Sequence, residues 1–367
     1  MKKIYNFGAG PSMLSAEVLE KAREELFGAK GGITLLEESA TSERFLSVRR
    51  ACERNLRKLL NIPSRYKVIF ANGAGVTQFS AIPLNLLSDR KRADYIVTGQ
   101  YSNLAYHEAK KYGDITMVAS SAGANPIHSV VPRLSSSDFR PDADYVHICY
   151  NNTIYGTKFD TVPDTGHIPL VADMTSSLLS EPTDVTKFGM IYADAGPNIA
   201  PAALTVIIIR EDLLGQARED TPSMLNYKNL AEGGGVYDTT AIYGMYMANL
   251  TFEWIRSVGG LEEMKRRNER KASQLYDFLD GGQEYYTGQA SKSFRSMTNV
   301  VFTTGSPRLD EKFVKEAAAE GLVGLAGHPS IGGMRASLYN AMPYEGVERL
   351  IAFMQRFMEE NPKFLDI

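Results

Sequence analysis

The sequence predicts an α/β protein in which a large domain with a mostly parallel sheet is followed by a smaller α+β domain. Three observations support this prediction. Short apolar segments rich in β-branched and aromatic residues alternate with stretches of helical periodicity up to about residue 258. These segments are almost continuously apolar, which is typical of parallel strands covered on both faces. The chain also has 367 residues, more than one hydrophobic core usually organises.

The elements can be placed in chain order. Residues 1–15 are rich in Gly and Pro and predict an extended arm before the large domain, which is expected at 16–258. Its expected helices are Ala16–Phe27, Phe45–Leu60, Gln78–Leu87, Ala105–Tyr112 and Tyr237–Val258. Its expected strands are Val68–Ala71, Tyr95–Thr98, Ile115–Ala119, Tyr145–Tyr150, Pro169–Ala172 and Leu204–Arg210. The smaller domain, 259–367, is expected to contain helices Leu261–Phe278, Asp310–Glu320 and Glu345–Met358 and strands Asn299–Thr303 and Met334–Tyr339.

Composition narrows the class of protein. A hydrophobic content of 44% with 23% charged residues is ordinary for a globular protein. The net charge of −3 gives no reason to expect nucleic acid or an anionic membrane as a partner, and no apolar run reaches membrane-spanning length. The two cysteines, Cys52 and Cys149, form no disulfide framework. With no signal peptide in the sequence, we expect a cytoplasmic protein, and no metal site is indicated.

Two segments place polar groups where an α/β sheet usually binds ligands. In Val68–Phe79, a strand leads through a turn containing Gly73 and Gly75 into a helix, and such a turn presents backbone N–H groups to an anion. A tight turn without a ligand has the same pattern. In Ile168–Ser177, an apolar strand ends at Asp173, whose carboxylate could hold a protonated ring nitrogen or cap the next turn. A third segment, Phe188–Thr205, is a short strand followed by a loop rich in small residues and proline.

Together these segments resemble the phosphoserine aminotransferase family, which belongs to the fold-type I pyridoxal-phosphate enzymes. The resemblance covers nearly the whole chain and is carried by Asn6–Leu14, Ala93–Gly99, Lys187–Gly189 and the long segment Gly332–Pro343. It implies a large domain of the pyridoxal-phosphate-transferase type with a mostly parallel mixed sheet. It also implies pyridoxal phosphate as the family cofactor, a small amino acid or carboxylate as substrate, and a homodimer.

The resemblance implies a cofactor pocket. Asp173 matches the aspartate that pairs with the pyridine nitrogen, Tyr101 takes the place of a stacking tryptophan, and Thr153 matches a threonine near the ring oxygen. The phosphate would be bound by the turn that contains Gly73, Gly75, Val76 and Thr77. The neighbouring subunit would add Asp238 and Thr239, although a carboxylate at position 238 would repel a phosphate.

The family pattern is broken at the position of its catalytic lysine. Pro197 stands there, preceded by Gly196 in place of a glutamine. Because proline has no amine, we expect any pyridoxal phosphate to be held non-covalently, or to be absent. Asp194 is an acid where the family has a small residue, and it could be catalytic or could pair with a neighbour.

The substrate side of the pocket is changed as well. Thr41 and Pro329 stand where the family has arginines that bind a phosphate. Arg44 could partly replace one of them. His328 remains beside Pro329, and Arg335 remains at the position that binds the substrate's α-carboxylate. The expected substrate-binding residues are therefore Thr41, His328 and Arg335.

Three functions follow from this pattern. The main expectation is a diverged homologue that has lost covalent transamination and acts as a repurposed enzyme on another small amino or carboxylic acid. The first alternative is an ordinary phosphoserine:2-oxoglutarate aminotransferase of serine biosynthesis. The second alternative is a non-catalytic binding or regulatory subunit.

Overall fold

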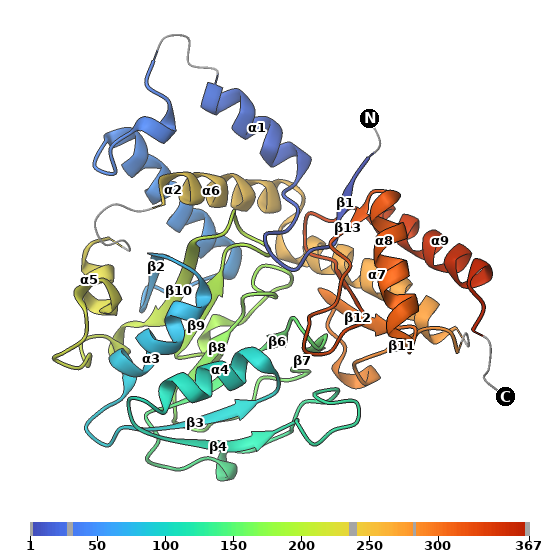
Figure 1. The fold of residues 1–367 in the computed structure, drawn as a ribbon. Coiled ribbons are helices and arrows are strands. Elements are labelled where there is room, and N and C mark those ends of the chain that lie inside the picture. Colours follow the sequence, from blue (N-terminus) through green and yellow to red (C-terminus); the bar gives the residue numbers. More distant parts are fainter. Residues whose placement is uncertain (1–2, 28–31, 235–240, 282–283, 364–367) are drawn as a thin grey trace.

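The computed structural model describes residues 3–27, 32–234, 241–281 and 284–363 (Figure 1). A large sheet with helices on both faces is followed by a smaller sheet packed against helices. This arrangement confirms the predicted α/β class. Within the described residues, no helix is long and apolar enough to cross a membrane.

The large sheet contains seven strands in the order β2-β10-β9-β8-β5-β3-β4. Their bounds are β2 Tyr66–Asn72, β3 Arg92–Val97, β4 Asp114–Ser120, β5 Tyr145–Cys149, β8 Leu170–Asp173, β9 Met190–Asp194 and β10 Leu204–Arg210. Strands β9, β8, β5, β3 and β4 pair in parallel, whereas β10 pairs antiparallel with both β2 and β9. The sheet is therefore mostly parallel with one reversed strand near its edge.

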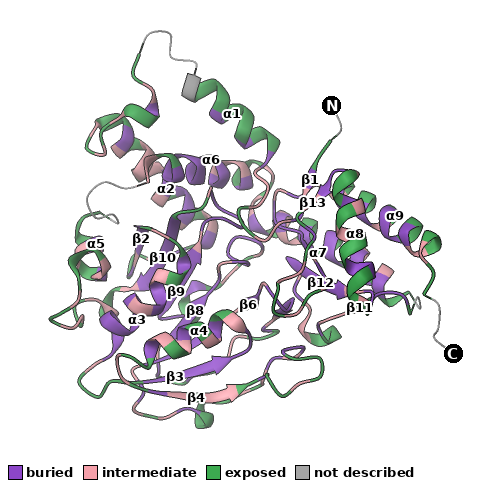
Figure 2. Ribbon diagram, viewed as in Figure 1, coloured by how far each residue is buried: buried purple, intermediate pink, exposed green. Residues whose placement is uncertain are grey.

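Both faces of this sheet are buried. Along β10, Val206 and Ile208 face one core and Ile207 and Ile209 face the other, and all four are fully buried (Figure 2). The first core is covered by α1 Ala16–Phe27, α2 Glu43–Leu60 and α6 Ile242–Ser257. The second is covered by α3 Gln78–Leu86, α4 Gln100–Ala109 and α5 Tyr227–Glu232. Two-sided burial explains why the strands read as continuous apolar runs in the sequence.

The C-terminal part has its own core and sheet. Strands β11 Thr287–Gly288, β12 Asn299–Thr303 and β14 Met334–Ser337 form an antiparallel sheet. It packs with α7 Gly260–Asp280, α8 Pro307–Ala319 and α9 Tyr344–Glu360. The short strands β6 Asn151–Asn152 and β7 Thr157–Lys158 pair with each other beside the large sheet. The domain boundary expected between 258 and 259 stays a prediction.

Several expected elements are shifted by local chemistry. The arm is extended, but it contributes β1 Tyr5–Asn6, which pairs in parallel with β13 Leu322–Val323 of the C-terminal part. Helix α4 begins at Gln100 instead of Ala105, because the Ser102 hydroxyl accepts hydrogen bonds from the N–H groups of Thr98 and Gly99. The start of the helix expected at Tyr237 lies outside the described residues, and α6 is described from Ile242.

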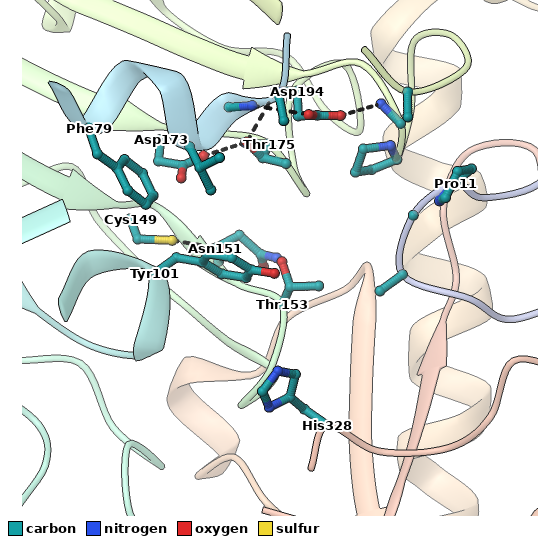
Figure 3. A pocket seen from close by; sticks show the side chains of 18 of the residues that line it. Pro11, Phe79, Tyr101, Cys149, Asn151, Thr153, Asp173, Thr175, Asp194 and His328 are labelled. Atoms are coloured by element: carbon teal, nitrogen blue, oxygen red, sulfur yellow. Dashed lines mark hydrogen bonds between the residues drawn. The ribbon is translucent and has the colours of Figure 1, made fainter. Parts of the chain in front are cut away.

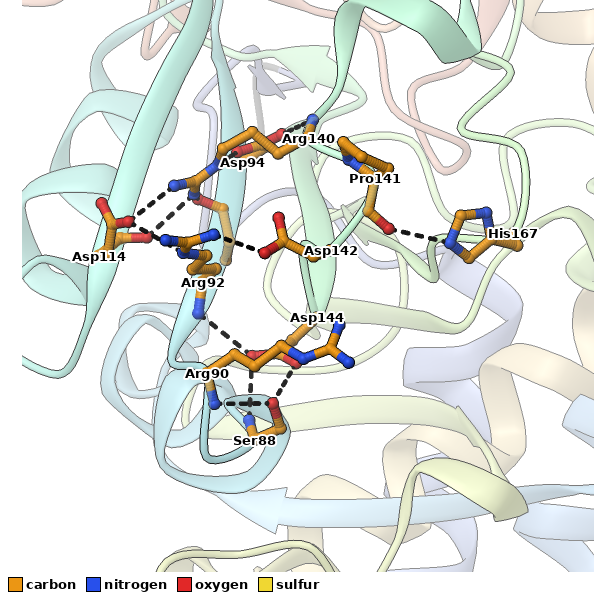
Figure 4. A network of polar contacts seen from close by, with 11 residues as sticks. Ser88, Arg90, Arg92, Asp94, Asp114, Arg140, Pro141, Asp142, Asp144 and His167 are labelled. Carbon is orange, nitrogen blue, oxygen red and sulfur yellow. Dashed lines mark hydrogen bonds and ion pairs between the residues drawn. The ribbon is translucent and has the colours of Figure 1, made fainter.

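The amino-terminal edge of the large sheet is held by charged groups (Figure 4). The Arg140 guanidinium donates to the buried Asp94 carboxylate at 2.7 Å and to the Asp114 carboxylate at 3.0 Å. The Asp144 carboxylate accepts from the backbone N–H groups of Ser88 and Arg92. These contacts tie the starts of β3, β4 and β5 together, which leaves the opposite, carboxyl-terminal edge for the loops of the site.

Lys271 on α7 fixes the loop that follows β14. Its ammonium is buried and donates to the carbonyl oxygens of Leu338, Tyr339 and Met342 at 3.0, 2.7 and 3.0 Å. A buried ammonium with three acceptors is fully satisfied, and each of those carbonyls gains a donor that water cannot supply.

We predict that Lys271→Met lowers the free energy of unfolding by about 2–4 kcal/mol, because the Leu338 and Met342 carbonyl oxygens lose their donor and the Tyr339 carbonyl keeps only the Met342 N–H. Urea unfolding monitored by circular dichroism measures this change. Lys265→Met on the same helix is the control, since the Lys265 ammonium is partly exposed and lies 3.7 Å from the Glu269 carboxylate. Equal stability of the two variants would contradict the prediction.

Candidate functional site

A cavity of about 340 Å³ lies at the carboxyl-terminal edge of the large sheet (Figure 3). The large sheet supplies its floor through the segments that follow β2, β5, β8 and β9, and β14 and the N-terminal arm close it. Its polar lining includes Tyr101, Cys149, Asn151, Thr153, Asp173, Thr175, Asp194, His328 and Arg335. Since parallel strands end at this edge, these side chains meet although they are far apart in the sequence.

Asp173 is the last residue of β8 and is buried between the ends of β5 and β9. Burial raises the pKa of its carboxyl group, and the charge of Asp194 raises that pKa further. The carboxylate accepts a hydrogen bond from the Thr175 N–H at 2.9 Å, and hydrogen bonds from the side chains of Thr175 and Tyr192 lower its pKa against the effect of burial. A cation brought into the cavity beside Asp173 would offset this desolvation and stabilise the charged carboxylate.

Asp194 ends β9 and joins three strand ends through hydrogen bonds (Figure 3). Its N–H donates to the Thr175 hydroxyl at 3.1 Å. Its two carboxylate oxygens accept from the N–H of Gly75 at 3.0 Å and the N–H of Gly196 at 2.9 Å. The segments after β2, β8 and β9 are therefore connected through this one residue, by its carboxylate and its backbone N–H.

Tyr101, in the first turn of α4, lines the cavity on the side of β5 (Figure 3). Burial raises the pKa of its phenol, although the ring remains 36% exposed. Cys149 and Asn151 follow the end of β5, and Thr153 comes directly after β6. This wall thus offers one aromatic face and several neutral hydrogen-bonding groups.

Arg335 on β14 is the cationic group among the described lining residues. Burial lowers the pKa of its guanidinium. Its Nε is buried and has no hydrogen-bond partner within the described residues. A guanidinium with an unused donor at a cavity wall is suited to bind a carboxylate.

His328 also lines the cavity. Its Nδ1 accepts from the Ser330 N–H at 3.2 Å, which holds the ring against its own turn.

Pro197 lines the cavity in a loop that is held from several sides. The Ser12 N–H donates to the Gly196 carbonyl at 3.1 Å, and the Ser12 hydroxyl donates to the Pro197 carbonyl. The Asn198 amide donates to the Leu178 carbonyl at 3.2 Å. The N-terminal arm therefore packs on the loop that carries Pro197, and no lysine stands among the described lining residues.

The structure brings most of the predicted site residues together. Those that line the cavity are Gly75, Val76, Tyr101, Thr153, Asp173, Asp194, Pro197, His328 and Arg335. Gly73 and Thr77 do not line it; the Gly73 N–H donates to the Ala203 carbonyl just before β10, and the Thr77 N–H donates to the Ala74 carbonyl within the turn. Thr41 and Arg44 do not line it either. The Thr41 hydroxyl contacts Ser39, and Arg44 donates to the Ile33 carbonyl. Asp238 and Thr239 lie outside the described residues.

Some lining residues were missed from the sequence. They are Ala9, Gly10, Pro11, Ala74, Phe79, Cys149, Asn151, Thr175 and Ala202. Cys149 and Asn151 follow a strand that was predicted, so the rule that ligands bind at strand ends could have found them. The contribution of the arm depends on tertiary packing, for which the sequence carries no local signal.

Comparison with known proteins identifies the family. The model of the class-V aminotransferases matches residues 4–350. Proteins named phosphoserine aminotransferase from Pseudomonas putida and Bacillus cereus are each 44% identical to the chain. Those matches cover 98% of the chain and 99% and 100% of the relatives.

Solved structures agree with these matches. A phosphoserine aminotransferase from Bacillus circulans subsp. alkalophilus is 39% identical, with a TM-score of 0.93, covering 98% of the chain and 99% of that structure. The structure of the pyridoxal-phosphate-bound enzyme from Trichomonas vaginalis is 32% identical, with a TM-score of 0.89, covering 96% and 100%.

The chain therefore belongs to the class-V aminotransferases, a family of fold-type I enzymes that depend on pyridoxal phosphate. Within that family, relatives that are 44–45% identical over 98% of the chain are named phosphoserine aminotransferase. The expectation of a repurposed enzyme with another substrate is therefore wrong, and the similarity favours the first alternative, a phosphoserine aminotransferase. That expectation gave a few pocket positions more weight than 44% identity along 98% of the chain.

The residues present fit pyridoxal phosphate in part. The buried Asp173 carboxyl with its raised pKa suits a protonated ring nitrogen, Tyr101 offers a face for the ring, and the unused Nε of Arg335 suits a substrate carboxylate. The covalent attachment has no candidate among the described lining residues, which include Pro197 and no lysine. The described lining thus supports non-covalent contacts to the ring and to a carboxylate.

Proposed function

We propose that this chain acts in phosphoserine:2-oxoglutarate transamination, with non-covalently held pyridoxal phosphate. The observation that carries the proposal is its similarity, over 98% of the chain, to proteins named phosphoserine aminotransferase. The reaction exchanges an amino group between two small carboxylates, which agrees with a cavity of about 340 Å³ that contains one buried guanidinium.

Each retained group has a part in this function. Arg335 binds the α-carboxylate of the amino or keto acid through its guanidinium. With pyridoxal phosphate bound, Asp173 would hold a proton on the ring nitrogen and Tyr101 would offer its face to the ring. When bound, the cofactor supplies the carbonyl that takes up the amino group and a ring that withdraws electrons. Since Pro197 cannot carry a proton, we expect the α-proton to leave without help from the chain at this position, and turnover to be slow.

A second candidate is a non-catalytic binding subunit. It is supported by the described lining of the cavity, which contains no lysine and has Pro197 at the position that the resemblance assigns to the family's lysine. Such a subunit would still bind amino acids and keto acids through Arg335, but it would not convert them.

A transamination assay separates the two candidates. Under the primary proposal, the purified protein transaminates phosphoserine above the background of free cofactor. We expect its rate to be at least about a thousandfold below that of the Pseudomonas putida relative assayed alongside, because one catalytic group is missing. Pro197→Lys should raise this rate without reaching the relative's rate, since Gly196 remains. Pro201→Lys, in the same loop but outside the described lining, is the control and should not raise it.

If the wild type shows no rate above background and Pro197→Lys shows no gain over Pro201→Lys, the second candidate replaces the first. A wild-type rate equal to the relative's would mean that another amine of the chain binds the cofactor. That result would contradict the proposal that Pro197 leaves the cofactor without a covalent partner.

We also predict that borohydride reduction in the presence of pyridoxal phosphate leaves no stoichiometric cofactor adduct in the cavity. Intact mass and peptide mapping measure this, with the Pseudomonas putida relative as a positive control. A single adduct at one lysine of the cavity would overturn the proposed non-covalent binding.

We further propose that the protein is a cytoplasmic homodimer. The family pattern supports the dimer, because Asp238 and Thr239 match residues that a neighbouring subunit contributes. The cytoplasm is supported by the two buried cysteines, Cys52 and Cys149, which form no disulfide. Light scattering at micromolar concentration should give twice the mass of one chain, and the mass of a single chain would contradict the dimer.

A further inference from the structure

Asp194 places a carboxylate in the turn that would otherwise receive an anion. The 3-10 turn Gly75–Thr77 leads directly into α3, and backbone N–H groups at the start of a helix favour negative charge. The Gly75 N–H donates at 3.0 Å to the Asp194 carboxylate. The other oxygen of the same carboxylate accepts from the Gly196 N–H at 2.9 Å. Two loops that are far apart in the chain thus donate to the same carboxylate, that of Asp194.

This contact is more than a local turn. An aspartate that accepts from the N–H two residues later is a common arrangement, and Asp164 does the same with Gly166 at 2.9 Å on the surface. Asp194 differs because its second oxygen reaches a residue 119 positions away in the chain. Both of its oxygens are therefore engaged by backbone donors.

Asp194 lies in contact with the two glycines whose N–H groups donate to it. A Cβ added to Gly75 would lie 3.5 Å from the Asp194 Cβ and 3.4 Å from the Thr175 hydroxyl, and one added to Gly196 would lie 3.1 Å from the Asp194 Oδ1. A phosphate that used the Gly75 N–H would have to displace the carboxylate or lie against it, and two anions in contact repel. The charge of Asp194 also acts on other groups of the cavity. Burial is the larger cause of the raised pKa of Asp173 and of Tyr101, and the charge of Asp194 raises both further.

We infer that Asp194 substitutes for a ligand phosphate at this turn, so that the cavity binds a pyridoxal-type ring without gaining affinity from its phosphate. Asp194 is thus a specificity-determining residue. The inference rests on the proposed function for the identity of the ring. On this inference, the Gly75 N–H does not bind the phosphate of the cofactor.

Equilibrium dialysis with pyridoxamine 5′-phosphate and pyridoxamine tests the inference. These probes differ only in the phosphate, and neither has an aldehyde that reacts with surface lysines. The wild type should bind both with similar affinity. Asp194→Ala frees the Gly75 N–H and removes the charge, and it should bind the phosphorylated probe about tenfold to a hundredfold more tightly while pyridoxamine binding stays the same.

Asp164→Ala is the matched control, because it removes a carboxylate with the same local turn contact far from the cavity, and it should change neither affinity. Asp194→Asn keeps the shape of the side chain and removes only its charge, so it should give a smaller gain in affinity for the phosphorylated probe. If Asp194→Ala fails to fold, this variant tests the inference in its place. A tenfold preference for the phosphorylated probe in the wild type would overturn the inference. An equal gain for both probes, or no gain, in the Asp194 variants would overturn it as well.

The transamination assay keeps the two proposals apart. A phosphate-specific gain in Asp194→Ala without any transamination by the wild type would contradict the proposed function alone. Transamination by the wild type without that gain would contradict the inference about Asp194 alone.

Discussion

The site depends on the reversed strand β10. It pairs antiparallel with β2 on one side and with β9 on the other, so β2 and β9 run in the same direction and end at the same edge. At the start of β10, Leu204 is paired with Asn72 and Thr205 with Asp194. The turn that follows β2 and the last residue of β9 are thereby brought to opposite sides of the same two residues. The contact between the Asp194 carboxylate and the Gly75 N–H follows from this register.

Much of the fold could be predicted from the sequence, because strands buried on both faces leave a continuous apolar pattern. Asp173 could also be identified, since a polar residue at the end of such a strand lies at the edge where α/β proteins bind ligands. The partner of Asp194 could not. Whether that acid is catalytic or paired depends on strand order and on the reversal of β10, and its partner Gly75 lies 119 residues earlier in the chain. Long-range pairing of this kind leaves no local pattern.

The direction of side chains could not be predicted from the sequence either. Arg44 was a candidate to replace a lost arginine, but α2 directs it to the Ile33 carbonyl and the Glu38 carboxylate, away from the cavity lining. The N-terminal arm was predicted as extended, yet its contacts with the loop of Pro197 follow from packing between segments 185 residues apart in the chain. The loop that carries Pro197 is thus held both from the arm and through Asn198.

The charges of the cavity are unevenly distributed. Arg335 lies on β14, whereas Asp173 and Asp194 both lie at the ends of the large sheet. A ligand that matches this distribution presents a carboxylate to β14 and a positive group to the sheet. An amino acid meets the first requirement, and a protonated pyridine ring meets the second. A phosphate at the turn before α3 meets neither, because the anion that this turn stabilises is already part of the chain. The same fold thus retains the contacts to ring and carboxylate while the site of the phosphate is filled from within.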